Sequence, residues 1–227
     1  MFQRDYILRM IEQFTKALAK ILFNKSLNNY EAALEELHNN YKGVFGIDKE
    51  LIAVSSAEEI VALLKLKNIA DPKVDIMLAE YLSEEADIQN IVSNGTCDKS
   101  SLDQKALELF FEAVLVHKEF QLPEYYSKIN DLVEATKSFA RQVELSKKII
   151  RYFELTNDYS KAEDILFGLT VSFPAVAGAE GEAFYKRLEC KTDEELLKGN
   201  FTRDEIHQGL AEFRKLMADP RAENKLK

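Results

Sequence analysis

Two histidines each follow an acidic residue three positions earlier, a pattern that could bind a metal ion. The pairs are Glu35 with His38 and Asp204 with His207. Residues three apart on an α-helix lie on the same face, so each pair could present both side chains to one ion. Helical di-metal carboxylate proteins use such a pair on each of two helices, with one bridging glutamate from each of two others.

The bridging glutamates of such a site would be Glu80 and Glu112, which interrupt the apolar runs IMLAEYL and LFFEAVL. Simpler roles compete with this interpretation. His38 precedes two asparagines near an expected helix end, and Asp204 falls in a first helical turn, where acidic residues favour the helix dipole. A metal-dependent enzyme of the helical di-metal carboxylate type is therefore the alternative hypothesis.

Basic residues gather on one face of a helix expected to run from a break near residues 136–138 to Leu155. This face carries Glu144, Lys147, Lys148, Arg151 and Glu154, with Arg141 one turn earlier. Cations clustered in an acidic protein could hold an acidic peptide or a terminal carboxylate. The other interpretation is an ordinary solvated helix face, because the Glu144–Lys148 spacing is that of a common surface pair.

Motifs specific for catalysis or for cofactor binding are absent from the sequence. It contains no glycine-rich phosphate loop, no HExxH zinc motif and no nucleophile elbow. We therefore expect no cofactor and favour a non-enzymatic protein–protein interaction or adaptor module. Its partner would be another protein or peptide, an acidic one if the basic face is the contact surface.

The elements that would position these residues are helices, and one pair of them follows a known pattern. The stretch 145–174, LSKKIIRYFELTNDYSKAEDILFGLTVSFP, resembles a tetratricopeptide hairpin. With Ala162 as the small mid-repeat residue, the bulky apolar positions of the first helix fall on Ile149 and Phe153, the buried side of the second helix includes Leu166 and Leu169, and Pro174 takes the closing position. Ser146, Ile150 and Leu169 depart from the usual pattern. The resemblance implies helical hairpins that present a binding surface.

A second resemblance involves both ends of the chain. The segments FQRDYILRMIEQF, EGEAFYKRL and DEELLKGNFTRDEI resemble an uncharacterised family of small all-helical proteins from Gram-positive bacteria. This resemblance implies a helical fold and a bacterial cytosolic setting. It implies no activity and no site residues.

Composition and charge exclude several functional classes. The formal net charge of −9 argues against a nucleic-acid binder and against an anionic membrane surface. Charged residues recur within every stretch of about 20 residues, so no segment is expected to span a bilayer. Cys97 and Cys190 are far apart and outside any CxxC motif, which indicates reduced thiols in a cytoplasmic protein.

Caps and apolar periodicity predict an all-α fold of antiparallel helical hairpins, arranged as a tetratricopeptide-like superhelix or an irregular bundle. Capping boxes are expected at Ser56/Glu59, Ser101/Gln104, Ser160/Glu163, Thr192/Glu195 and Thr202/Glu205. The alanine- and glycine-rich stretch 173–181 is expected to be a flexible joint. We therefore expect a hairpin domain over 1–175, C-terminal helices packed on it over 176–220, and a disordered tail over 221–227.

The first helix, expected from about Phe2 to Phe23, has a wide apolar arc. Phe2, Tyr6 and Ile7 on this arc could pair with a second copy in a two-fold homodimer. Packing of the whole helix inside its own chain is the favoured interpretation.

Overall fold

The computed structural model describes residues 2–95, 99–117, 123–137 and 142–218, with the side chains of residues 2 and 3 left out. Within these ranges the chain forms twelve α-helices and one π-helix, and none of the described residues is in a strand. Successive helices pack mostly antiparallel, which confirms the predicted all-α class. No helix in the described ranges is long and apolar enough to cross a membrane. The helices belong to two compact units, residues 1–139 and 140–227.

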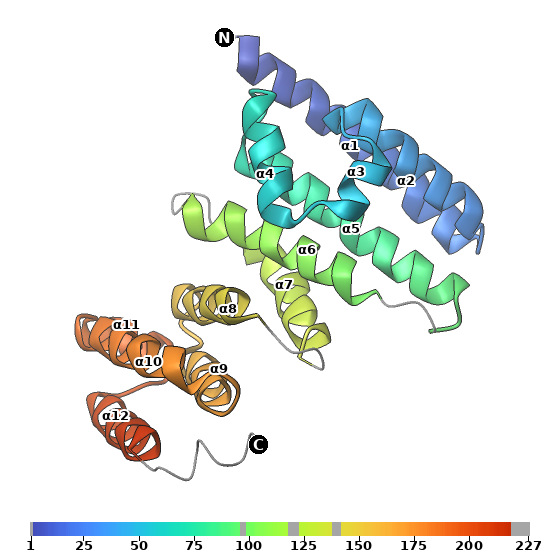
Figure 1. The fold of residues 1–227 in the computed structure, drawn as a ribbon. Coiled ribbons are helices and arrows are strands. Elements are labelled where there is room, and N and C mark those ends of the chain that lie inside the picture. The colour runs from blue at the N-terminus through green and yellow to red at the C-terminus, as the bar shows by residue number, and fades with distance from the viewer. Residues whose placement is uncertain (1, 96–98, 118–122, 138–141, 219–227) are drawn as a thin grey trace. The chain divides into compact units, whose positions relative to one another are not determined.

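Unit 1 is built around a long central helix (Figure 1). Its elements are α1 (Phe2–Ser26), α2 (Tyr30–Phe45), α3 (Lys49–Val54), α4 (Ala57–Leu66), α5 (Pro72–Val92), α6 (Ser100–Phe111), the π-helix η1 (Glu112–Val116) and α7 (Pro123–Ala135). The main packed pairs are α1 with α2 and α5 with α6, and α5 also packs against α1, α2 and η1. A helix enclosed in this way must be buried on all sides, and residues 74–86 of α5 are indeed all buried.

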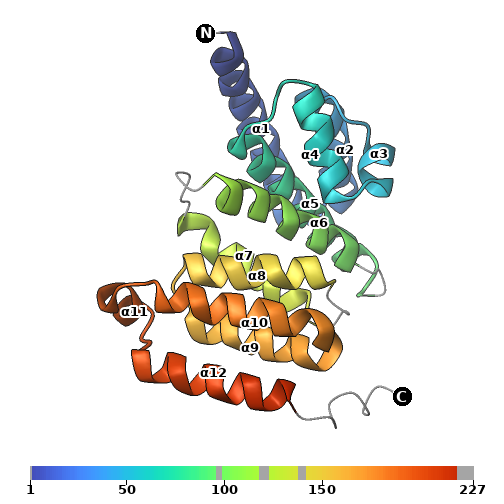
Figure 2. The same cartoon turned by 60° about the vertical axis from the view of Figure 1, so that its left-hand side comes forward.

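Unit 2 consists of five helices in which each long helix packs on the next (Figure 2). These are α8 (Val143–Leu155), α9 (Tyr159–Ser172), α10 (Pro174–Glu189), α11 (Asp193–Lys198) and α12 (Arg203–Met217). The expected hairpin is the pair α8–α9, and its apolar positions Ile149, Phe153, Ala162, Leu166 and Leu169 are all buried.

The prediction of a flexible joint at 173–181 is wrong, because this stretch forms the first half of α10. Alanine is the best helix former, and Pro174 occupies a position in the first turn where proline is tolerated. Gly181 is there for packing: a Cβ at this position would lie 2.2 Å from Cζ of Phe213 on α12. The two compact units divide between residues 139 and 140.

Three of the five expected capping boxes are present, at Ser56/Glu59, Thr192/Glu195 and Thr202/Glu205. The prediction for Ser160/Glu163 is wrong, since α9 begins at Tyr159 and its N-cap is Asp158. Glu163 instead accepts a hydrogen bond from Tyr185 Oη at 2.5 Å. The Ser101/Gln104 box is also wrong, because α6 begins at Ser100 and Gln104 donates to Glu108.

Candidate functional site

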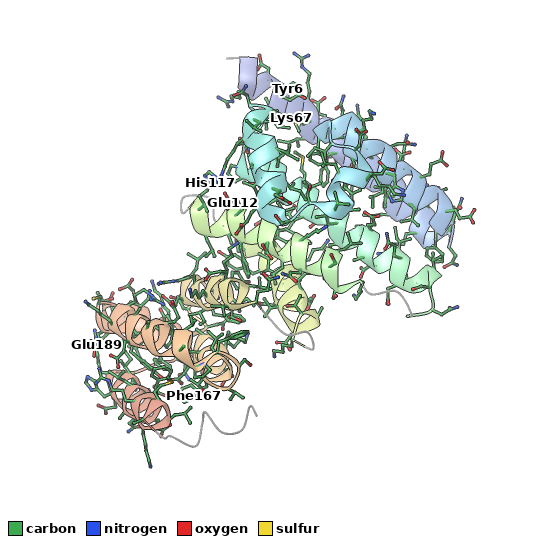
Figure 3. The ribbon with its side chains drawn as sticks, viewed as in Figure 1. Tyr6, Lys67, Glu112, His117, Phe167 and Glu189 are labelled. Atoms are coloured by element: carbon green, nitrogen blue, oxygen red, sulfur yellow. The ribbon has the colours of Figure 1, made fainter. Side chains whose placement is uncertain are left out.

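A surface hollow of about 700 Å³ lies in unit 1, where the first half of α1 meets the ends of α2 and α4. Its polar lining residues are Tyr6, Arg9, Lys67 and Asn68, and the others are Phe45, Gly46 and Ile69. Figure 3 shows Tyr6 of α1 and Lys67 after α4 lying near one another at this end of the unit. Tyr6 and Arg9 are three residues apart and so share one face of α1.

Two left-handed turns shape one side of the hollow. Gly46 ends α2 with φ +65°, and its backbone N–H donates to the carbonyl of Lys42 at 3.0 Å. Asn68 follows α4 with φ +57°, a conformation that asparagine tolerates better than most residues. A Cβ on Gly46 would lie 3.4 Å from Lys67 Nζ, so the Lys67 ammonium rests close to the bare Cα of this glycine.

The floor of the hollow is apolar and rigid. Phe45 is only 1% exposed and packs edge-on against Tyr81 of α5, with ring centroids 5.7 Å apart. Ile69 is also buried, whereas the Tyr6 side chain is 48% exposed. The hollow thus combines a fixed apolar base with an aromatic side chain at its rim.

The two cations of the hollow have no carboxylate partner. Neither Arg9 nor Lys67 forms an ion pair with any residue that the structure describes. Lys42, which lies near the end of α2, does form an ion pair, because its Nζ lies 2.8 Å from Oδ1 of Asp48. In a chain of net charge −9, two exposed cations that line one hollow with buried apolar residues could interact with an anionic group.

The basic face predicted from the sequence lies on α8, and much of its charge is compensated. Lys147 Nζ lies 2.8 Å from Glu144, and Arg151 lies 3.7 Å from Glu154. Lys148 is half-buried on the same helix, and Arg141 lies outside the described residues. Intrachain ion pairs therefore reduce the positive potential that this face presents.

The carboxylates beside Arg151 belong to a network organised by Arg187 on α10. Arg187 donates from Nε and Nη2 to Glu154, the latter at 2.5 Å, and from Nη2 to Glu180 at 3.0 Å. Burial lowers the pKa of Arg187, but these hydrogen bonds outweigh it and raise that pKa overall. The network joins α8 to α10 and is a structural feature of unit 2.

The predicted metal ligand His38 has a different partner. Its Nε2 lies 2.9 Å from Glu85 on α5, and its Nδ1 lies 3.3 Å from Lys49 Nζ. Burial raises the pKa of Glu85, but hydrogen bonds from His38 and from Tyr41 Oη lower it below its ordinary value. His38 is thus part of a polar network that fastens α2 to α5.

The other metal candidates are paired with lysines or belong to different units. Glu112 forms an ion pair with Lys65, and Glu80 forms one with Lys128. Glu35 lies on α2 in unit 1, whereas Asp204 and His207 lie on α12 in unit 2. The described residues contain no group of three or more His, Cys, Asp or Glu side chains that could hold a metal ion.

The N-terminal residues considered for a homodimer fall in different environments. Ile7 is buried within unit 1, and Tyr6 lies at the hollow. The side chain of Phe2 lies outside the described residues. This part of α1 therefore contributes to the hollow.

Comparison with known proteins adds a family but no activity. The family described as a family of unknown function, DUF6483, matches residues 1–218. No curated protein and no solved structure matches the chain.

Proposed function

Because this chain belongs to the DUF6483 family, whose function is unknown, we propose a function from its own residues: a non-enzymatic protein-interaction module. The module would act in the bacterial cytosol and bind an acidic segment of another protein. The observation that supports this proposal is the hollow of unit 1, where Arg9 and Lys67 form no ion pair with any described residue and share the lining with the buried Phe45 and Ile69.

The openness of the hollow favours a macromolecular partner. Sites for small molecules usually enclose most of the ligand surface. Here the rim residue Tyr6 is half-exposed, and the side chains of Arg9 and Lys67 are exposed. A segment of another protein can place a few groups in such a hollow and keep the rest of its surface outside.

The hairpin α8–α9 supplies a second candidate surface, because its resemblance to tetratricopeptide hairpins favours peptide binding on α8. Lys147, Lys148 and Arg151 would be its contact residues. We rank this surface below the hollow, since Lys147 and Arg151 already have carboxylate neighbours in their own chain.

Affinity capture from native cytosol tests the proposal with three variants beside the wild type. The hollow variant is Arg9→Glu/Lys67→Glu, and the α8 variant is Lys147→Glu/Lys148→Glu. The matched control is Arg4→Glu/Lys16→Glu, which changes the same charge on exposed residues of α1 outside the hollow.

The expected result is a partner that the wild type and the control retain and that the hollow variant loses. Recovery of that partner with purified components should give the same order of affinities. Loss in the α8 variant alone would move the site to unit 2. A wild-type protein that captures nothing would overturn the interaction function.

A further inference from the structure

The chemistry of the hollow specifies more than a negative charge. We infer that it binds the C-terminal end of a partner chain whose last residue has an apolar or aromatic side chain. This inference rests on the proposed function and names the chemical class of the partner segment at the same site.

Two cations on opposite elements suit one carboxylate. Arg9 comes from α1 and Lys67 from the end of α4, and both line the same hollow. A guanidinium can bind both oxygens of a carboxylate, while an ammonium acts as a point charge beside it. Neither group forms an ion pair with a described residue, so a ligand carboxylate would not have to displace such a pair.

The apolar floor would let the hollow distinguish a C-terminal residue from an aspartate or glutamate side chain. Phe45 and Ile69 line the same hollow as the cations, and both are buried. A C-terminal residue has its carboxylate and its side chain on the same Cα, so it could place a charge at the cations and an apolar group at the floor together. Aspartate and glutamate have the charge at the end of the side chain and leave the floor unoccupied.

Fluorescence anisotropy with labelled pentapeptides tests this inference on the full-length protein. The reference probe has four alternating glycine and serine residues, a dye at its N-terminus, and a C-terminal phenylalanine with a free carboxylate. Three comparison probes have the terminus amidated, the phenylalanine replaced by serine, or a central glutamate with an amidated serine end.

We expect the reference probe to bind best. Amidation and loss of the aromatic ring should each weaken binding about tenfold, the range of one charged hydrogen bond or one buried ring. Arg9→Gln and Lys67→Gln should each cause a loss of similar size, while Lys16→Gln, an exposed site on the same helix, should leave affinity unchanged. Circular dichroism and the melting temperature verify that each variant is folded.

The outcomes separate the inference from the function on which it rests. Equal affinity for the free and amidated ends, or stronger binding of the central glutamate, would overturn the chain-end inference. If the captured partner is still lost in the Arg9→Glu/Lys67→Glu variant, the interaction function stands without it. Binding of the reference probe with no captured partner would contradict the proposed function.

Discussion

Arg187 in unit 2 and the pair Arg9 and Lys67 in unit 1 are cations of the same chain in opposite environments. Arg187 is 26% exposed and lies between two carboxylates, Glu154 and Glu180, which are themselves mostly buried. Arg9 and Lys67 are exposed and form no ion pair with a residue that the structure describes. The charge of Arg187 is paired within the fold, whereas the charges of Arg9 and Lys67 are available to a ligand.

This difference separates a structural role from a binding role. A cation whose carboxylates are already in place stabilises the helices that supply them, and a ligand would have to compete with those carboxylates. A cation without such a partner contributes little to folding and can interact with a ligand at full strength. Positive charge on a helix face is therefore informative only when its neighbours are known.

The largest expected effect comes from removing the compensated cation. Arg187→Met should lower the free energy of unfolding by about 3 kcal/mol, because the mostly buried Glu154 and Glu180 would lose their close guanidinium and keep only Arg151, at 3.7 and 3.8 Å. Urea unfolding followed by circular dichroism, with the two units tracked by separate local probes, measures this loss. We expect it in unit 2.

The matched variant in unit 1 is Arg9→Met, for which we expect a change within about 0.5 kcal/mol, as for most surface substitutions. Equal losses in the two variants would mean that exposure and charge compensation do not separate these arginines, and the comparison would fail.

Asp75 extends the comparison to acidic residues, because it is a buried carboxylate that forms no ion pair with a described residue. Asp75 on α5 is 4% exposed and forms no ion pair with the described residues. Burial, and to a smaller extent the nearby Glu112, raise the pKa of Asp75 to about 7, against an opposing effect of Lys65. The folded state therefore binds this proton more tightly than the unfolded state does, and stability is lost as the pH rises from about 4 to 7.

Asp75→Asn removes this dependence. At pH 8 it should raise the free energy of unfolding by about 2 kcal/mol, which is less than the full linkage value because the amide is also buried. At pH 5 the gain should shrink by more than half. Urea midpoints of wild type and variant at both values measure it, and a gain that grows toward low pH would contradict the assignment to Asp75.

Salt should affect binding at the exposed cations more than the stability contributed by the paired Arg187. Binding of an acidic partner at exposed Arg9 and Lys67 should weaken about tenfold between 50 and 500 mM sodium chloride, because exposed charges are screened. The stability difference between wild type and Arg187→Met should change far less over the same range, since that network is mostly buried. Titrations and unfolding curves in the same buffers give both numbers. Salt-insensitive binding would indicate that the hollow acts through its apolar floor alone.

The sequence predicts features that depend on neighbouring residues along the chain. The bounds of α2, Tyr30–Phe45, and the start of α5 at Asp71-Pro72 are confirmed, because capping and proline chemistry act within one turn. The error at 173–181 has the opposite cause. Gly181 serves contact with Phe213 of α12, and a local pattern cannot distinguish such a glycine from one in a joint.

The candidate site required contacts that no local pattern contains. Tyr6, Phe45 and Lys67 come from three elements, and only the packing of the helices brings them to one hollow. The basic residues of α8 were recognised, but Arg187 was not, because its pairing with Glu154 depends on which helix packs beside α8. His38 was paired with Glu35 by spacing, whereas the fold pairs it with Glu85.

The smallest effect tests the geometry that holds Lys67 at the hollow. Gly46 has φ +65° and would place a Cβ 3.4 Å from Lys67 Nζ, whereas Gly43 lies inside α2 with no neighbour within 4 Å of its Cβ position. Gly46→Ala should therefore cost about 1 kcal/mol of stability through the left-handed conformation, while Gly43→Ala should gain up to about 1 kcal/mol of helix propensity. Because the added methyl group touches only the flexible end of Lys67, affinity for the reference probe should fall about twofold to threefold in Gly46→Ala and stay unchanged in Gly43→Ala. Both variants could keep full affinity while their stabilities change with the expected opposite signs. In that case the turn at Gly46 fixes the end of α2 but does not position the Lys67 ammonium. Arg9 alone would then have to account for recognition of the carboxylate.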